Sequence, residues 1–206
     1  MKQEQILIRL SGKDQIGLTA SFMAILAKYD AQVLDIGQAD IHSTLSLGIL
    51  IRIGEEVSGQ VMKELLFKAS ELGIYIGFEP ISDEDYEAWA GRQGRNRYIL
   101  TAIGRSLSAG QIHAATQVIA AHGLNIDAIK RLTGRMSIMH PERNVRACVE
   151  FSIRGTLENK HGFQKELMAL ASQIGMDFSF QKDDMYRRMR RLICFDMDST
   201  LIQAEC

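Results

Sequence analysis

Leu72-Gly73-Ile74 joins a predicted helix to a predicted strand, and Ile174-Gly175-Met176 repeats that corner in the second half of the chain. A glycine directly after the last helical turn is typical of a C-cap, because glycine adopts the left-handed backbone conformation without steric cost. Before the first corner, apolar residues at helical spacing predict one face of an amphipathic helix: Val61, Leu65, Leu66, Ala69 and Leu72. After the corner, residues 74–78 predict a strand, which we expect Pro80 to end.

The elements that precede this corner complete one structural unit. Residues 6–10 predict a strand that ends at Ser11-Gly12, and residues 17–29 predict an amphipathic helix. Residues 33–41 and 45–53 predict two strands on either side of a polar turn. The predicted order is therefore strand, helix, strand, strand, helix, strand.

The second half of the chain follows the same order. Strands are predicted at residues 98–103, 124–132, 145–154 and 176–180, with one helix that begins near Ser108 and another over residues 163–174. Because both copies share the order and the glycine corner, the sequence predicts an internal duplication. Each copy predicts an α+β, ferredoxin-like unit, in which a four-stranded antiparallel sheet carries two helices on one face.

These elements divide the chain into five segments. We expect units at residues 1–81 and 98–181, linkers at residues 82–97 and 182–190, and the start of a further domain at residues 191–206. The linkers are charged, and the basic run from Arg187 to Arg191 is interpreted as a solvated linker.

Composition excludes several classes of function. The net charge of -1 gives no field that favours nucleic acid or anionic membrane, so we expect neither as a partner. No apolar run approaches the ~20 residues of a membrane helix, and no signal peptide precedes the first strand. The three cysteines are widely spaced, which indicates reduced thiols and a cytoplasmic protein.

The chemistry that the sequence predicts is concentrated near residue 200. The apolar run from Leu192 to Phe195 predicts a buried strand, and Asp196-Met197-Asp198-Ser199-Thr200 follows it directly. Open α/β sheets place their active sites at the carboxyl ends of such strands. Two carboxylates two residues apart can serve there as a nucleophile and as a separate proton donor.

This segment, Phe195-Asp-Met-Asp-Ser-Thr-Leu-Ile-Gln-Ala-Glu205, resembles the first motif of haloacid-dehalogenase-type phosphotransferases and, within them, the phosphoserine phosphatase family. The resemblance implies the first strand of an α/β haloacid-dehalogenase-like domain. It also implies that Asp196 forms an aspartyl-phosphate and that Asp198 acts as acid and then base. Glu205 would hold the amino group of phosphoserine. Mg²⁺ would be bound by the carboxylate of Asp196 and the main-chain carbonyl of Asp198.

Two questions about this motif stay open at the level of sequence. Ser199 and Thr200 either donate hydrogen bonds to the phosphoryl oxygens or only shape the turn. The superfamily also needs a later Ser or Thr, a Lys and further acidic residues, and the six residues after Thr200 supply no such set. We therefore expect the 206-residue chain to be inactive by itself, whereas the full-length enzyme would hydrolyse phosphoserine to serine, the last step of serine biosynthesis.

Two further segments resemble the ACT domain, an amino-acid-sensing regulatory module: Asp14-Gln15-Ile16-Gly17-Leu18-Thr19 and Gly123-Leu124-Asn125-Ile126. In that family a loop glycine lets main-chain N–H groups approach an amino acid, and an Asn at the start of strand 2 of a neighbouring domain contacts it. The resemblance thus implies an effector site of Asp14, Gly17, Leu18, Thr19 and Asn125, with serine as the candidate effector. We also expect a homodimer.

The two copies differ at these positions. We expect Val33 to stand where the second copy has Asn125, and residues 104–108 lack the Asp-x-x-Gly pattern, so one effector site is predicted. Three alternatives stay open. In the first, the chain is a stand-alone regulatory ACT module without catalysis. In the second, it is part of a phosphotransferase that acts on another small phosphate ester. In the third, its two loops are ordinary connections that bind nothing.

Overall fold

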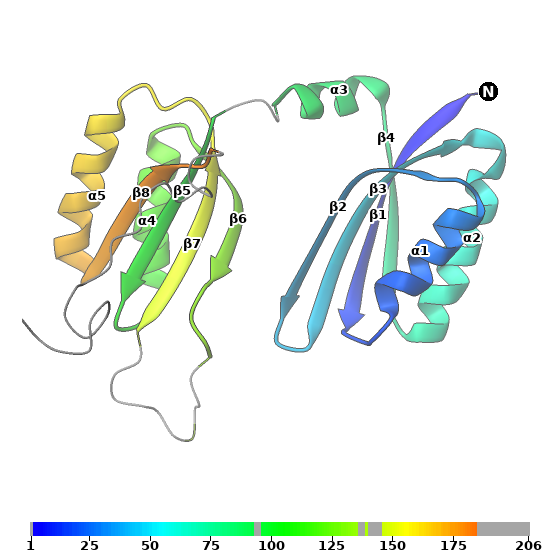
Figure 1. Ribbon diagram of the computed structural model, residues 1–206, viewed down its shortest axis with the longest axis horizontal. Coiled ribbons are helices and arrows are strands. Elements are labelled where there is room, and N and C mark those ends of the chain that lie inside the picture. Colours follow the sequence, from blue (N-terminus) through cyan, green and yellow to red (C-terminus); the bar gives the residue numbers. More distant parts are fainter. Residues whose placement is uncertain (1, 93–95, 136–138, 140–145, 185–206) are drawn as a thin grey trace, which may run out of the picture. The chain divides into compact units, whose positions relative to one another are not determined.

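The computed structural model describes residues 2–92, 96–135, 139 and 146–184. The chain divides into two compact units, Met1–Gln93 and Gly94–Cys206, and each is described by itself. The two units have matching sheets and matching helix pairs (Figure 1). The α+β fold of two tandem ferredoxin-like units is therefore confirmed, while the predicted strand Leu192–Phe195 lies outside the described residues.

Unit 1 contains four strands and three helices. Its elements are β1 (Gln3–Lys13), α1 (Leu18–Lys28), β2 (Gln32–Ile41), β3 (Thr44–Gly54), α2 (Glu55–Leu72), β4 (Tyr75–Ile81) and α3 (Asp83–Arg92). The strands form one antiparallel sheet in the order β2-β3-β1-β4. Strands β2 and β4 are therefore its edges.

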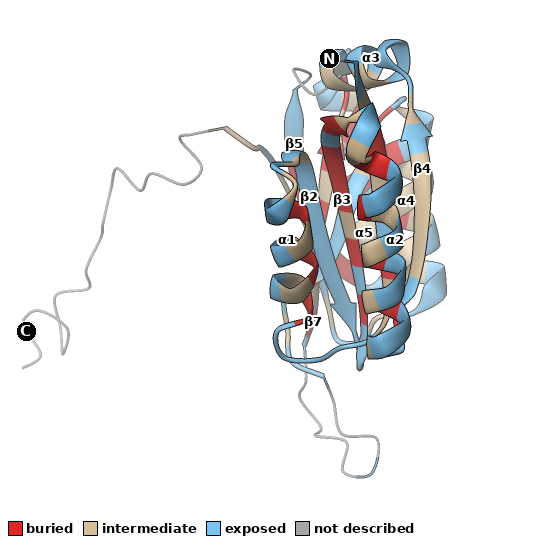
Figure 2. Ribbon diagram, turned by 90° about the vertical axis from the view of Figure 1, so that its right-hand side faces the viewer, coloured by how far each residue is buried: buried red, intermediate tan, exposed pale blue. Residues whose placement is uncertain are grey.

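The core of unit 1 lies between this sheet and helices α1 and α2. Alternate residues of β3 face the helices and are almost fully buried: Leu45, Leu47, Ile49, Ile51 and Ile53. Phe22 and Leu26 of α1 and Leu65 of α2 close the core from the other side. Figure 2 shows this division, with β3 largely buried and the edge strand β2 exposed. Burial of each large apolar side chain contributes about 1.5–3 kcal/mol.

Unit 2 repeats the arrangement without a counterpart of α3 among its described residues. Its elements are β5 (Arg97–Gly104), α4 (Ala109–Ala121), β6 (Asn125–Arg131), β7 (Ala147–Arg154), α5 (Lys160–Ile174) and β8 (Met176–Lys182). The sheet order is β6-β7-β5-β8. Leu100, Ile119, Phe151 and Phe163 are fully buried at the centre of its core.

Both predicted glycine caps are confirmed. Gly73 and Gly175 are the C-caps of α2 and α5, with φ values of 65° and 64°. The main-chain N–H of Gly73 donates to the carbonyl of Ser70, and that of Ile74 donates to the carbonyl of Ala69. These bonds satisfy carbonyls at the end of α2 that have no partner within the helix.

Three local expectations differ from the structure. Pro80 lies inside β4 and does not end it, because β4 is an edge strand and a missing N–H is tolerated there. Most of the segment expected as a linker forms α3, whose N-terminus is capped by the hydroxyl of Ser82. Leu66, placed on the buried face of its helix, is 54% exposed.

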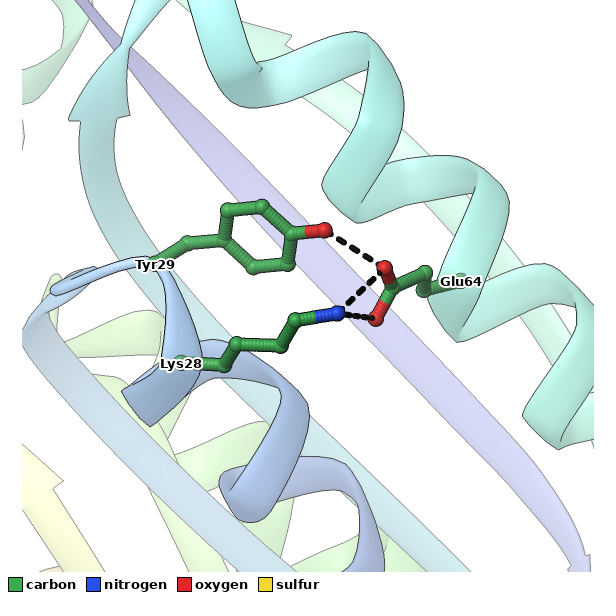
Figure 3. Close-up of polar contacts among 3 residues, drawn as sticks. All are labelled: Lys28, Tyr29 and Glu64. Carbon is green, nitrogen blue, oxygen red and sulfur yellow. Dashed lines mark hydrogen bonds and ion pairs between the residues drawn. The ribbon is translucent and has the colours of Figure 1, made fainter.

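A polar contact between the two helices recurs in both units. In unit 1, Glu64 of α2 accepts hydrogen bonds from Lys28 Nζ, at 2.8 and 3.1 Å, and from the hydroxyl of Tyr29 (Figure 3). In unit 2, His122 Nε2 lies 3.2 Å from Glu166 Oε2. Tyr29 and His122 are the C-caps of equivalent helices, so the duplication preserves the place of this contact but changes its chemistry.

Within the described residues, no helix is both long enough and apolar enough to cross a membrane.

The glycine cap predicts opposite effects of one substitution at two sites of α2. We expect Gly73→Ala to destabilise unit 1 by about 1–2 kcal/mol, because its left-handed backbone strains any Cβ. Gly59→Ala, at an exposed position inside the same helix, should stabilise it by about 0.5–1 kcal/mol. An added Cβ meets no atom within 4 Å at either site, so sterics do not explain the difference. Urea unfolding followed by Trp89 fluorescence measures both changes in the free energy of unfolding. Changes of the same sign in the two variants would contradict the assignment of Gly73 as a left-handed C-cap.

The contact at Glu64 predicts a pH-dependent stability. Hydrogen bonds from Lys28 and then from Tyr29 hold the pKa of Glu64 below its ordinary value of 4.5. The contact therefore stabilises unit 1 above pH 4.5, and this stabilisation is lost as the pH falls towards the lowered pKa. We expect Glu64→Gln to lower the urea midpoint at pH 7. The difference in midpoint between this variant and the wild type should become smaller as the pH falls below 4.5.

The matched control is Glu71→Gln, which removes an exposed carboxylate that is paired with Lys68 inside the same helix. It should change the midpoint less than Glu64→Gln does. A gap between wild type and Glu64→Gln that stays constant down to pH 3 would contradict the role of Glu64.

Candidate functional site

The loop between β1 and α1 is held in place at two points. The main-chain N–H of Asp14 donates to the carbonyl of Ser43 at 2.9 Å, which ties the loop to the turn between β2 and β3. Gln15 Nε2 donates to the carbonyl of Leu72 at 2.9 Å, which ties it to the end of α2. The loop is therefore fixed although its tip is open, with Ile16 fully exposed.

Gly17 sets the direction in which α1 begins. It is the N-cap of α1, with φ of 83° and ψ of 3°, and no side chain caps the helix. The first N–H groups of a helix have no carbonyl partner within it, and they favour a negative charge. The N–H of Leu18 donates to the carbonyl of Gln15 at 3.3 Å, which leaves the N–H groups of Thr19 and Ala20 as the donors of the uncapped first turn.

The side chains of Leu18 and Thr19 have separate roles. Leu18 is 3% exposed and packs in the core, so only its main chain borders the loop. Thr19 Oγ1 donates to Gln38 Oε1 of β2 at 2.9 Å. The residues expected to bind an effector thus lie at one end of unit 1, with Asp14 exposed beside them.

The equivalent loop of unit 2 is closed by its own side chains. Ser108 Oγ accepts from the N–H of Gln111 at 3.2 Å, and Gln111 Oε1 accepts from the N–H of Ser108 at 2.9 Å. This capping box occupies the N–H of the third helical residue, the donor that Ala20 leaves open in α1. Gln111 Nε2 also donates to the carbonyl of Ile174, which repeats the tie that Gln15 makes in unit 1. The pattern Ser-x-x-Gln at residues 108–111 is the signal that sequence reasoning missed.

Asn125 begins β6 in unit 2 and belongs to a small polar cluster. Its Nδ2 donates to Asp127 Oδ1 at 3.0 Å, and Asp127 Oδ1 also accepts from Arg154 Nη2 at 2.7 Å. The side chains of Asp127 and Arg154 are 22% and 17% exposed. Arg154 Nη1 is buried and has no hydrogen-bond partner among the described residues. Sequence reasoning did not find Asp127 or Arg154, because their contact depends on the register of β6 against β7.

The register also corrects the expected equivalence of Val33 and Asn125. Asn125 pairs with Arg154, and Gln32 pairs with Arg52 at the same place in unit 1, while Val33 corresponds to Ile126. Both strands carry a bulge directly afterwards, at Leu34 and at Asp127. The first copy thus has an amide at this position after all. The prediction of a single effector site therefore depends on the difference between the two strand-to-helix loops, and no longer on Val33.

The remaining predicted residues are not placed. Asp196, Asp198, Ser199, Thr200 and Glu205 lie outside the described residues. Within residues 2–92, 96–135, 139 and 146–184, no group of three His, Cys, Asp or Glu side chains could hold a metal ion. The loop at Gly17 and the cluster at Asn125 lie in different units.

Comparisons with known proteins place these features in a family context. Residues 4–79 match the family model of the ACT domain. The chain is 28% identical over 204 residues to phosphoserine phosphatase SerB2 of Mycobacterium tuberculosis, an alignment that covers 97% of this chain and 46% of that protein. It is also 28% identical over 202 residues to a phosphoserine phosphatase of Streptomyces coelicolor, covering 97% of this chain and 45% of that protein.

The chain therefore spans somewhat less than half the length of these curated relatives. Among solved structures, an unknown protein from Galdieria sulphuraria matches with a TM-score of 0.68 at 16% identity. That match covers 89% of this chain and all of the other, and it supports the fold alone. The resemblance to the ACT domain is thus confirmed for residues 4–79, and the similarity to phosphoserine phosphatases extends over 97% of the chain.

Proposed function

We propose that this chain is the amino-acid-sensing regulatory region and first catalytic motif of a cytoplasmic phosphoserine phosphatase. The observation that carries the proposal is the similarity to two phosphoserine phosphatases over 97% of the chain. The segment from Phe195 to Glu205 adds the first of the residues that the chemistry needs. The full-length enzyme would hydrolyse O-phosphoserine to serine and phosphate as a homodimer.

In this proposal Asp196 and Asp198 divide the chemistry. A carboxylate oxygen of Asp196 forms a bond to phosphorus as the bond from phosphorus to the serine oxygen breaks. Asp198 donates its proton to that leaving oxygen and then removes a proton from the water that releases phosphate from Asp196. Glu205 pairs with the substrate's ammonium group, and Ser199 and Thr200 border the phosphoryl group.

Mg²⁺ fits the donors that this motif offers. A carboxylate oxygen of Asp196 and the main-chain carbonyl of Asp198 are hard oxygen ligands of the kind that Mg²⁺ prefers. A bound cation would offset the repulsion between two carboxylates and a phosphate dianion.

The regulatory part of the proposal assigns an effector to Asp14, Gly17, Leu18, Thr19 and Asn125. The uncapped first turn of α1 supports it, because the open N–H groups of a helix favour a carboxylate. Asn125 contributes an amide that can donate to the effector's carboxylate. Serine, the product of the proposed reaction, is the effector we propose. The capping box at Ser108 argues against a second site of the same kind.

The effector assignment predicts one L-serine bound per chain in isothermal titration calorimetry. Asn125→Ala should weaken binding about tenfold or more, because a hydrogen bond to a charged ligand is lost. Gln32→Ala is the matched control, since it removes an amide at the equivalent position of the other unit, and it should bind serine as the wild type does. Two sites per chain, or equal affinity of Asn125→Ala and wild type, would contradict the assignment.

The catalytic assignment predicts the behaviour of the full-length enzyme that contains this chain. Asp196→Asn should abolish Mg²⁺-dependent release of phosphate from phosphoserine, and Asp198→Asn should lower kcat by about 10²–10⁴-fold. Met197→Leu, between the two carboxylates, conserves volume and should retain activity. The 206-residue chain alone should release no phosphate above background.

Near-normal turnover by Asp196→Asn would show that this residue is not the nucleophile. A full-length protein that binds serine but hydrolyses no phosphate ester would instead favour a regulatory ACT module without catalysis.

A further inference from the structure

The face of the unit 1 sheet that points away from α1 and α2 carries a cavity of about 340 Å³. Strands β1 to β4 line one side of it, and α3 lines the other. The cavity lies within unit 1 and is distinct from the loop at Gly17, since the two have no residue in common. Its volume lies within the range of small-molecule sites.

The walls of this cavity are apolar and aromatic. Tyr86 and Trp89 of α3 form one wall, with their ring centroids 5.9 Å apart at an interplanar angle of 43°. Leu7 and Leu50 lie on the sheet side. Leu50 points away from the main core, because side chains alternate between the two faces along β3, and it is nevertheless only 8% exposed.

Two glycines keep the sheet side of the cavity open. Gly37 of β2 and Gly48 of β3 are direct cross-strand partners, and both line the cavity. A Cβ at Gly37 would meet no atom within 4 Å, and one at Gly48 would come only within 4.0 Å of the carbonyl oxygen of Gly37. Side chains at these positions would therefore occupy the space without a clash.

The two charged residues that line the cavity are both acidic. Asp35 and Asp85 both line it, and no lining residue carries a positive charge. The carboxylate of Asp35 accepts one hydrogen bond from the N–H of Ile36, and that of Asp85 accepts one from the hydroxyl of Ser82. On the same sheet face, Arg9, the cross-strand partner of Gly48, forms an ion pair with Glu79 at 2.8 Å. A cation would be favoured here and an anion disfavoured.

We propose that this cavity binds a small primary amine that carries an aromatic or branched apolar group and no carboxylate. The apolar group would pack against Leu7, Leu50 and the two glycines. The ammonium group would lie near Asp35 and Asp85, where the faces of Tyr86 and Trp89 add cation–π attraction. The site is independent of the serine site proposed above, so either proposal can fail without the other.

Trp89 is the only tryptophan of the chain, so its emission reports directly on the cavity. We expect 2-phenylethylamine to change the Trp89 emission of the 206-residue chain with a saturable dependence on concentration. Two analogues separate the contributions of charge: 2-phenylethanol lacks the ammonium group, and L-phenylalanine adds a carboxylate. Both should bind more weakly than the amine, L-phenylalanine because its carboxylate meets Asp35 and Asp85.

Matched variants separate the cavity from the rest of the sheet. Gly48→Val should abolish the response to the amine by filling the space, whereas Gly77→Val should not. Gly77 lies on the same sheet face but outside the cavity, and an added Cβ there meets only the ring of Tyr75 at 3.9 Å. Asp35→Asn and Asp85→Asn should each weaken binding about two- to fivefold, while Asp83→Asn, outside the cavity, should not.

Three results would overturn the proposal. The first is the absence of a saturable response to 2-phenylethylamine, and the second is equal affinity for the amine and for 2-phenylethanol. The third is a change in Trp89 emission that depends on protein concentration alone and disappears in Gly48→Val. Such a change would show that a second copy of the chain fills the cavity.

Discussion

The fold of each unit depends on the register of its two central strands. In unit 1, β1 and β3 pair so that Ile6, Ile8 and Leu10 lie on the same face as the buried residues of β3. Because side chains alternate along a strand, a slip of one residue would move this whole apolar set to the opposite face. The register therefore decides which face receives α1 and α2, and it leaves Gly48 and Leu50 on the face that α3 borders.

The two units share this architecture but differ at the N-terminus of their first helix. Unit 2 satisfies the start of α4 with Ser108 and Gln111, and such a cap contributes about 1 kcal/mol. Unit 1 has Gly17 there and no capping side chain, so it gives up that stabilisation. Open donors at a fixed, exposed helix end are what an anionic ligand requires. The absence of a capping side chain in unit 1 and its presence in unit 2 is therefore the physical basis on which we propose the effector loop in unit 1.

Much of the fold could be predicted from local pattern. Apolar periodicity located two helices in each unit, and Gly73 and Gly175 marked the ends of α2 and α5. The elements that escaped prediction depend on contacts distant in sequence. Pro80 is tolerated only because β4 is an edge, and α3 has few apolar residues apart from Tyr86 and Trp89, which line a cavity against the sheet.

The candidate site shows the same limit. The resemblance singled out the loop glycine Gly17 because the residues of that motif are consecutive, and the structure gives this glycine a positive φ of 83°. The equivalence of Gln32 and Asn125 was not predicted, because it rests on their pairing with Arg52 and Arg154 across neighbouring strands. Asp127 and Arg154 meet across two strands, so no local pattern joins them.

Amide hydrogen exchange with and without L-serine tests the central claim most directly, because it reports on the two helix starts in the same molecule. Saturating serine should slow exchange in the first turn of α1, at residues 17–21, and leave residues 108–112 at the start of α4 unchanged. Equal protection of both segments, or no protection at residues 17–21, would contradict the claim.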